Sequence, residues 1–284
     1  MNLYLNGEYL PLEQGRISVE DRGFQFGDGV YEVIRVYRGK PFRLGKHLAR
    51  LEQSVKGIEM PLPEPLVKIE EVCRKVIGRL EEAQIYLQVT RGSAPRLHVF
   101  PKDVRPTFVA YAQPVTRPPD DRVYTLKSVV DDRWGRCNLK TVCLLPNVLG
   151  RQKAVDAGCD EGLFVRPDNT VTEGTASNAF FVRDGALFTP TPECFLDGIT
   201  RRTVMDLARK RGVEVVERAI WPEELESFQQ MFITGSAAEV TFVREVGPWN
   251  FEVGDLSRQL AKDYDDLVNG RIQNSAPVAV TTDA

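Results

Sequence analysis

The first part of the chain mixes two patterns of apolar and polar positions. In some stretches apolar residues alternate with polar ones, which is typical of strands, and in others they recur every three or four positions, which is typical of amphipathic helices. Strands are therefore predicted over residues 2–9, 29–38, 83–91 and 107–113, and helices over 46–55 and 66–80. The first helix rests on Leu48, Leu51 and Val55, and a proline-rich break separates it from the second.

A stiff polar segment, Pro114–Pro119, interrupts the pattern and marks a predicted domain boundary. Beyond it, strands are predicted over 123–130, 161–166, 179–183 and 231–234, and helices over 147–157 and 200–211. A glycine follows each of the two helices, which is a common stop signal. The predicted domains are 1–117 and 118–274, and the small, polar residues 275–284 are predicted to form a flexible tail.

Composition narrows the classes of protein. The 284 residues are 42% hydrophobic and 27% charged, which favours a folded chain with a sizeable core. The net charge of -3 and the lack of a basic block argue against a nucleic-acid partner. No apolar run approaches the roughly 20 residues of a membrane span, and the first ten residues do not resemble a signal peptide. Five cysteines without a C-x-x-C pair favour free thiols in the cytoplasm.

The two histidines, His47 and His98, leave little room for a metal site or a Ser-His-Asp triad. Lys140, in contrast, lies in a largely apolar window, and burial would lower the pKa of its amine from about 10.4. A neutral amine attacks aldehydes and forms Schiff bases. A lysine that lays its stem on apolar surface with its head in water gives the same window.

Three further features suggest binding groups. Glu173 lies in a turn of small hydroxyl residues, where a carboxylate could keep a pyridine nitrogen protonated, although exposed loop glutamates share this setting. Gly198–Arg201 opens a predicted helix and 234–238 is a small-residue turn, so both offer backbone amides to an anion, as ordinary caps also do. Arg50 could add a forked contact to the same anion.

The last feature is a pair of basic residues two positions apart. In an extended segment Arg96 and His98 point to the same face, where two donors suit a carboxylate. A solvated loop with one surface arginine would have the same spacing.

The order of these features resembles the fold-type IV enzymes that depend on pyridoxal 5'-phosphate (PLP), and within them the D-amino-acid aminotransferases. The resemblance runs from about Tyr4 to about Arg271. It is carried by segments 20–32, 88–98, 136–140, 172–178 and 198–201. The lysine and glutamate segments mark the wider fold-type IV group, and the Arg-x-His segment marks the D-amino-acid branch.

This resemblance implies an α/β (α+β) fold: a small N-terminal α/β domain, a larger C-terminal mixed α/β domain, and PLP in the cleft between them. It implies ping-pong transfer of amino groups between D-amino acids, such as D-alanine and D-glutamate, and 2-oxo acids, such as 2-oxoglutarate and pyruvate. Lys140 would form the internal aldimine and move the proton at the substrate carbon. No metal is expected.

The resemblance also assigns the binding residues. Glu173 would pair with the pyridine nitrogen, and the phosphate would be held by Arg50, Ile199, Thr200 and Ser236. The substrate α-carboxylate would be held by Tyr31, Arg96 and His98, the last two reaching in from the partner subunit of a homodimer. Two departures stand out: Ala176 and Gly235 occupy positions where the family often has hydroxyl residues.

Three alternatives remain. A branched-chain L-amino-acid aminotransferase would keep the cofactor, but the Arg96–His98 pair argues against it. An aminodeoxychorismate lyase would change the reaction, and the same pair with Tyr31 argues against that. A non-enzymatic PLP-binding protein would leave Tyr31, Arg96 and His98 without a role.

Overall fold

The computed structural model describes residues 2–193 and 195–272, so the predicted tail over 275–284 lies outside them. The chain divides into two compact units. The first comprises Met1–Pro118, Arg133–Val148 and Glu193–Leu196, and the second comprises Pro119–Asp132, Leu149–Pro192 and Asp197–Ala284. The segment that carries Lys140 therefore belongs to the first unit.

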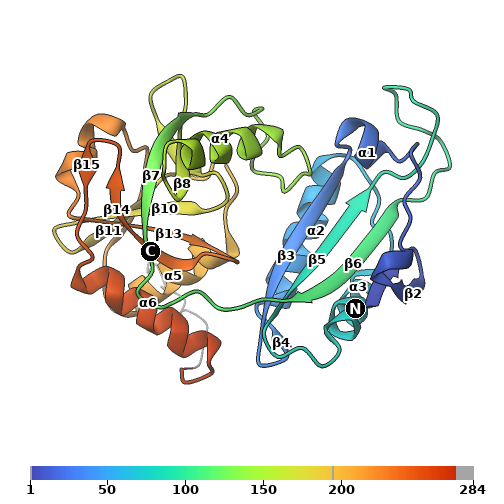
Figure 1. Ribbon diagram of the computed structural model, residues 1–284, viewed down its shortest axis with the longest axis horizontal. Helices are drawn as coiled ribbons and strands as arrows, with labels where there is room; N and C mark the ends of the chain where they lie inside the picture. The colour runs from blue at the N-terminus through green and yellow to red at the C-terminus, as the bar shows by residue number, and fades with distance from the viewer. Residues whose placement is uncertain (1, 194, 273–284) are drawn as a thin grey trace, which may run out of the picture. The chain divides into compact units, whose positions relative to one another are not determined.

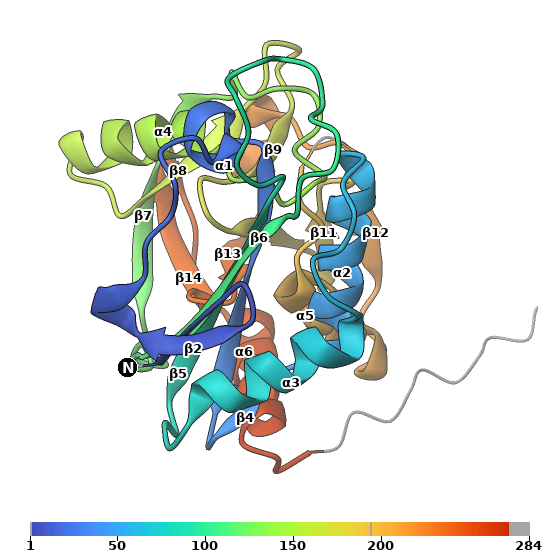
Figure 2. The same ribbon diagram turned by 90° about the vertical axis from the view of Figure 1, so that its right-hand side faces the viewer.

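The first unit is built on a six-stranded sheet in the order β2-β1-β6-β5-β3-β4, in which all neighbouring strands are antiparallel. Its strands are β1 (Asn2–Leu5), β2 (Glu8–Pro11), β3 (Gly29–Tyr37), β4 (Lys40–Pro41), β5 (Ala83–Thr90) and β6 (Thr107–Pro114). The helices α2 (Leu44–Gly57) and α3 (Leu66–Ile77) cover one face, as Figure 2 shows. The short helices η1 (Leu12–Gln14) and α1 (Arg22–Phe26) precede β3.

Strand alternation puts the core of this unit between the sheet and the two helices. On β5, alternate residues are fully buried, namely Ala83, Ile85, Leu87 and Val89, whereas Gln84, Tyr86 and Gln88 are half-buried. From α2, Leu48, Leu51 and Val55 enter the same core, as their spacing predicted. The other face of the sheet carries Tyr31 on β3, in the opposite phase to the buried Val30.

The second unit is built on a nine-stranded mixed sheet. Eight strands follow the order β12-β11-β10-β13-β14-β7-β8-β9, and β15 pairs with β14. The strands are β7 (Val123–Val130), β8 (Glu161–Val165), β9 (Val171–Gly174), β10 (Asn178–Arg183), β11 (Ala186–Thr189), β12 (Val215–Glu217), β13 (Gln230–Gly235), β14 (Glu239–Val246) and β15 (Trp249–Asn250). The helices are α4 (Leu145–Asp156), which starts in the first unit's segment, α5 (Ile199–Lys210), η2 (Pro222–Ser227) and α6 (Asp255–Val268).

The central strands of this sheet are buried on both faces. Phe181 and Ile233 belong to a core cluster that also contains Leu225 of η2 and Phe228. The neighbouring Phe180 and Phe232 point the other way and stack with ring centroids 5.0 Å apart. On β13 and β14 pack α5 and α6, which lie side by side in Figure 1.

Most predicted elements are confirmed to within two or three residues, and the mixed α/β fold is confirmed. The strand predicted over 2–9 is wrong, because Asn6 and Gly7 adopt positive φ angles of 51° and 109° and turn the chain into the β1–β2 hairpin. The prediction lacked the helices α1, α6, η1 and η2, the short strand β4, and five strands of the second unit, namely β9, β11, β12, β14 and β15. No helix among the described residues is long and apolar enough to cross a membrane.

Candidate active site

The backbone around Lys140 is fixed against two elements of the first unit. The Lys140 carbonyl accepts a hydrogen bond from the Tyr31 amide on β3 at 3.0 Å. The Lys140 amide donates to Ser54 Oγ on α2 at 3.1 Å. Leu139 is buried against Gly57, where an added Cβ would lie 2.5 Å from Leu139 Cδ2. Lys140 therefore has a defined position although it lies outside regular structure.

The side chain of Lys140 lies beside Tyr31. Its Nζ is 4.1 Å from the centroid of the Tyr31 ring, within cation–π range. Both side chains are half-buried, so a small molecule could reach the amine. This places the predicted nucleophile next to one predicted carboxylate-binding residue.

Arg50 is held by a buried glutamate that the sequence analysis missed. Glu32 is fully buried on β3, and Arg50 on α2 donates to it from Nε at 2.7 Å and from Nη2 at 2.8 Å. His47 Nδ1 lies 2.7 Å from Oε2 of the same carboxylate, the oxygen that also accepts from Arg50 Nη2. The signal was present in the sequence, since Glu32 occupies the buried strand phase between Val30 and Ile34.

The charges in this cluster follow from its contacts. Burial opposes ionisation of Glu32, but the charge and hydrogen bonds of Arg50, followed by those of His47, lower the pKa of Glu32 to about 2. Burial lowers the pKa of His47 below its usual value in spite of Glu32. At neutral pH the carboxylate is thus ionised and accepts a hydrogen bond from the Nδ1–H of a neutral imidazole. This arrangement fixes the guanidinium of Arg50.

Arg96 and His98 lie in the loop between β5 and β6, in the first unit. The loop bends at both residues and is not the extended strand expected from their spacing. The pair nevertheless meets at one side chain, because Arg96 Cζ lies 4.9 Å from the Phe26 ring centroid and the His98 ring lies 5.5 Å from it. Both are exposed in the single chain.

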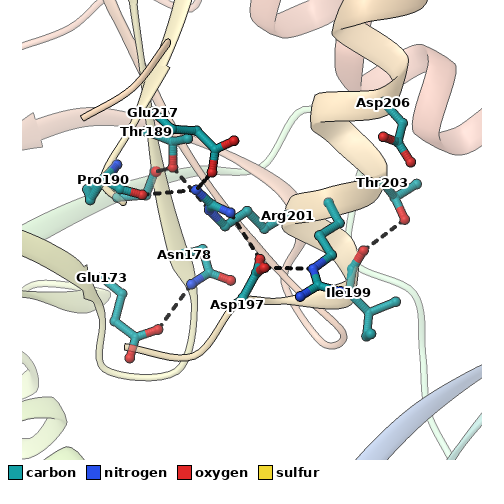
Figure 3. Close-up of polar contacts among 12 residues, drawn as sticks. Glu173, Asn178, Thr189, Pro190, Asp197, Ile199, Arg201, Thr203, Asp206 and Glu217 are labelled. Atoms are coloured by element: carbon teal, nitrogen blue, oxygen red, sulfur yellow. Dashed lines mark hydrogen bonds and ion pairs between the residues drawn. The ribbon is translucent and has the colours of Figure 1, made fainter. Parts of the chain in front are cut away.

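Glu173 and its neighbours form the second group, in the second unit. Glu173 is 6% exposed at the end of β9, and Asn178 Nδ2 donates to its Oε2 at 3.0 Å (Figure 3). Asn178 in turn packs against Gly198, where an added Cβ would lie 2.1 Å from Asn178 Oδ1. A glycine is therefore required at this point for Asn178 to hold the carboxylate.

Two buried hydroxyls belong to strand ends near Asn178, one close to it along the chain and one across the sheet. Ser177 Oγ and Thr234 Oγ1 have no hydrogen-bond partner among the described residues. Thr234 on β13 pairs with Asn178 on β10, which places both hydroxyls at the same end of the two strands. Buried polar atoms are rarely without partners, so this region suits a polar ligand.

The N-terminus of α5 adds backbone donors. Gly198 is the N-cap residue and no side chain caps the helix, so the first amides are open to an anion. Ile199 and Thr200 begin the helix and are buried. The adjacent Arg201 is committed to the protein itself, since it contacts Asp197 and Glu217 at 2.9 Å each (Figure 3).

The two departures at 176 and 235 are related in space. An added Cβ at Gly235 would lie 3.3 Å from the Ala176 carbonyl oxygen and 3.6 Å from Ala238 Cβ, a tight fit. The glycine thus allows the turn before β10 to approach the turn after β13. Ser236 is half-buried in the latter turn.

Each unit therefore carries one part of the predicted set. The first contains Tyr31, Arg50, Arg96, His98 and Lys140, and the second contains Glu173, Ile199, Thr200 and Ser236. In the second unit the helix amides and the two hydroxyls without partners fit a phosphate group, and the buried Glu173 fits a protonated ring nitrogen. Among the described residues no cluster of His, Cys, Asp or Glu is arranged to hold a metal ion.

Known proteins are similar to this chain in amino-acid sequence and in fold. Residues 29–246 match the model of the family described as amino-transferase class IV. The chain is 37% identical over 251 residues to D-alanine aminotransferase of Bacillus licheniformis, covering 87% of this chain and 88% of that one. The branched-chain aminotransferase of Thermoproteus uzoniensis with norvaline superposes with a TM-score of 0.88 at 27% identity, over 95% of both chains.

A second solved structure gives the same result: the T.th. branched-chain amino acid aminotransferase with pyridoxamine 5'-phosphate has a TM-score of 0.87 at 27% identity, over 95% of both chains. The sequence identity is higher to the D-alanine enzyme than to these structures, which confirms the resemblance to the D-amino-acid branch. The matched region contains both Lys140 and Glu173. The chain is an aminotransferase and belongs to the amino-transferase class IV family.

Proposed function

We propose that this aminotransferase uses PLP to move amino groups between D-amino acids, such as D-alanine and D-glutamate, and 2-oxo acids, such as 2-oxoglutarate and pyruvate. The observation that carries the proposal is the position of Lys140 Nζ, 4.1 Å from the Tyr31 ring. A reactive amine beside a carboxylate-binding phenol is what an amino-acid substrate requires. The similarity to D-alanine aminotransferase supports the D-enantiomer.

Six residues of the chain would hold the cofactor. Lys140 would hold it through Nζ, Glu173 would contact the ring nitrogen, and the amides of Ile199 and Thr200 would bind the phosphate. Arg50 and Ser236 would add donors to the phosphate. When bound, PLP supplies an aldehyde that takes up and returns amino groups and a ring that withdraws electrons from the substrate carbon.

The remaining steps are carried out by side chains. The α-carboxylate would be bound by Tyr31, Arg96 and His98, which fixes the orientation of the α-carbon. Lys140 Nζ would remove the proton from the α-carbon and return it at the end of the reaction. Glu173, oriented by Asn178, would keep the ring nitrogen protonated. With the carboxylate fixed, one face of the α-carbon is presented to Lys140, which selects one enantiomer.

The proposal includes a homodimer in which Arg96 and His98 serve the site of the other subunit. The loop that carries them exposes Leu97, Val99 and Phe100 by 60%, 69% and 53% in the single chain. Three neighbouring apolar side chains of this kind suit coverage by a second copy. A mixed dimer of a Lys140→Ala chain and an Arg96→Ala chain tests this: one of the two sites should regain activity, whereas no regained activity in a confirmed mixed dimer would contradict a shared site.

The cytoplasm is the proposed compartment. Cys73, Cys137, Cys143 and Cys159 are free thiols, and Cys194 lies outside the described residues. Reducing conditions keep such thiols from pairing.

A product assay tests the function. Purified enzyme with 2-oxoglutarate should form pyruvate from D-alanine and little or none from L-alanine, and it should not consume L-leucine. Faster turnover of L-leucine than of D-alanine would instead support a branched-chain aminotransferase, which the solved structures above represent.

A further inference from the structure

The aromatic ring of Phe26 is the common contact of two arginine side chains and one histidine ring. Arg22 Cζ lies 4.8 Å from the ring centroid and Arg96 Cζ lies 4.9 Å from it. The His98 ring is 5.5 Å away, with an interplanar angle of 48°. Phe26 therefore touches both members of the Arg96–His98 pair, from a helix that precedes them by some 70 residues along the chain.

The backbone between the two members of the pair is also fixed. Arg22 Nη1 donates to the Leu97 carbonyl at 2.6 Å. Because Leu97 lies between Arg96 and His98, this hydrogen bond fixes the backbone from which both side chains extend. The loop passes next to α1, which carries Arg22 and Phe26, in both views (Figures 1 and 2).

The support under this contact is rigid. Arg22 is 4% exposed, and its Nε donates to Asp28 Oδ2 at 2.8 Å. Arg91 binds the same carboxylate through Nε and Nη2, at 2.8 and 3.0 Å. Although burial opposes ionisation, hydrogen bonds from Arg91 and Arg22 lower the pKa of Asp28, so it stays charged. Asp21 caps α1 by accepting from the Gly23 amide at 2.8 Å.

We infer that Phe26 is a positioning residue for the substrate α-carboxylate, because its ring holds Arg96 and His98 in one place. The inference rests on the proposed role of that pair in binding the carboxylate. A solvent-exposed arginine samples many rotamers, and ordering it on binding costs free energy. Contact with the ring restricts Arg96 beforehand, so more of its interaction with the substrate appears as affinity.

The prediction is a loss of substrate affinity without a loss of chemistry. Phe26→Leu keeps an apolar side chain and removes the ring. Because both contacts with the ring are lost, the D-alanine concentration that half-saturates the half-reaction should rise about 5- to 30-fold. The rate at saturating D-alanine should stay within about twofold, because the substitution leaves Tyr31 and Ser54, which hold Lys140, unchanged. Stopped-flow measurement of the holoenzyme gives both values.

Two matched variants serve as controls. Phe26→Tyr retains the ring and should restore the half-saturating concentration to within about twofold of the original value. Phe24→Leu makes the same change on the same helix, at a side chain that is 78% exposed, and should leave both values unchanged. Thermal unfolding of each variant checks that the fold is intact.

A substrate without a carboxylate separates positioning from general packing. With D-alaninol, in which a hydroxymethyl group replaces the carboxylate, Phe26→Leu should have no more than about a twofold effect. An equal loss with D-alanine and D-alaninol would overturn the inference, as would an unchanged D-alanine reaction in Phe26→Leu. Arg96→Ala is the reference: if it too leaves D-alanine binding unchanged, the failure lies in the proposed role of the Arg96–His98 pair.

Discussion

Lys140 combines a fixed backbone with a side chain beside Tyr31. Lys140→Ala should abolish nearly all transamination, because it removes the amine that lies beside Tyr31. Borohydride reduction of the holoenzyme followed by peptide mass spectrometry should find the pyridoxyl group on Lys140. Lys127→Ala, at an exposed strand position, is the control and should keep full activity. A pyridoxyl group on any other lysine would contradict the assignment.

Glu173 is buried and oriented by Asn178, as a group that contacts a charged ring nitrogen should be. Glu173→Gln keeps the shape and removes the charge, so the cofactor should stay bound while proton removal slows. Loss of a charged hydrogen bond of roughly 1.5–3 kcal/mol corresponds to a decrease of about 10- to 150-fold. Single-turnover kinetics with D-alanine measures it, and an unchanged rate would make Glu173 a purely structural residue.

Arg96 is expected to donate hydrogen bonds to both oxygens of the α-carboxylate, since its guanidinium is planar and stays charged. Arg96→Ala should lower kcat/KM for D-alanine about 10- to 150-fold for the same reason. Cofactor content, measured by absorbance after release, should be unchanged, because the proposed phosphate contacts lie elsewhere. Loss of bound cofactor in this variant would show that Arg96 has a different role.

The sequence predicted these residues to different degrees. Lys140, Glu173 and Arg96 stood out through the resemblance of their segments to a family. Glu32 and His47 did not, although a glutamate in the buried phase of a strand is a physical anomaly that periodicity alone exposes. Phe26 had no signal, because its importance arises from contacts with residues about 70 positions later.

At the level of elements, α2 is joined to β3 through Arg50 and Glu32. The pKa of Glu32 is lowered to about 2, so its contribution to stability is fully present above the unfolded value of about 4.5 and is lost as the pH falls through about 2. At pH 7, Glu32→Gln should reduce the free energy of unfolding by about 3–5 kcal/mol, because Arg50 loses its buried partner.

Urea unfolding from pH 7 to pH 2 measures this effect. The difference between the free energies of unfolding of the original protein and of Glu32→Gln should narrow between about pH 4.5 and about pH 2, because there Glu32 is protonated in the unfolded chain but still ionised in the folded one. Glu70→Gln breaks an exposed pair with Arg74 and should cost no more than about 0.5 kcal/mol. A constant difference over the whole pH range would mean that Glu32 is not ionised in the folded protein.

Elements with a clear local pattern were predictable, such as β3, β5 and α3. The helix α6 was missed although Leu260, Tyr264 and Val268 recur every four positions and are buried. The short helix α1 depends on its cap at Asp21 and on the burial of Arg22. Its five residues are too few to show a helical pattern of apolar positions. Strand order was beyond prediction, because β14 pairs with β7 across more than 100 residues.

In the whole molecule, each of the two compact units is made of three separate segments of the chain. The predicted boundary between 117 and 118 follows the first long stretch of the first unit, but residues 133–148 return to that unit and bring Lys140 with them. Such a crossing depends on tertiary contacts, here the bonds of Lys140 to Tyr31 and Ser54, and no local pattern encodes it.

The stereochemistry of the overall reaction tests the central claim most directly. The enzyme is supplied with racemic alanine and 2-oxoglutarate, and chiral chromatography follows the alanine that remains and the glutamate that forms. If Tyr31, Arg96 and His98 fix the carboxylate so that Lys140 reaches one face of the α-carbon, D-alanine should disappear, L-alanine should remain, and the glutamate formed should be D-glutamate. Consumption of L-alanine with formation of L-glutamate would contradict the account.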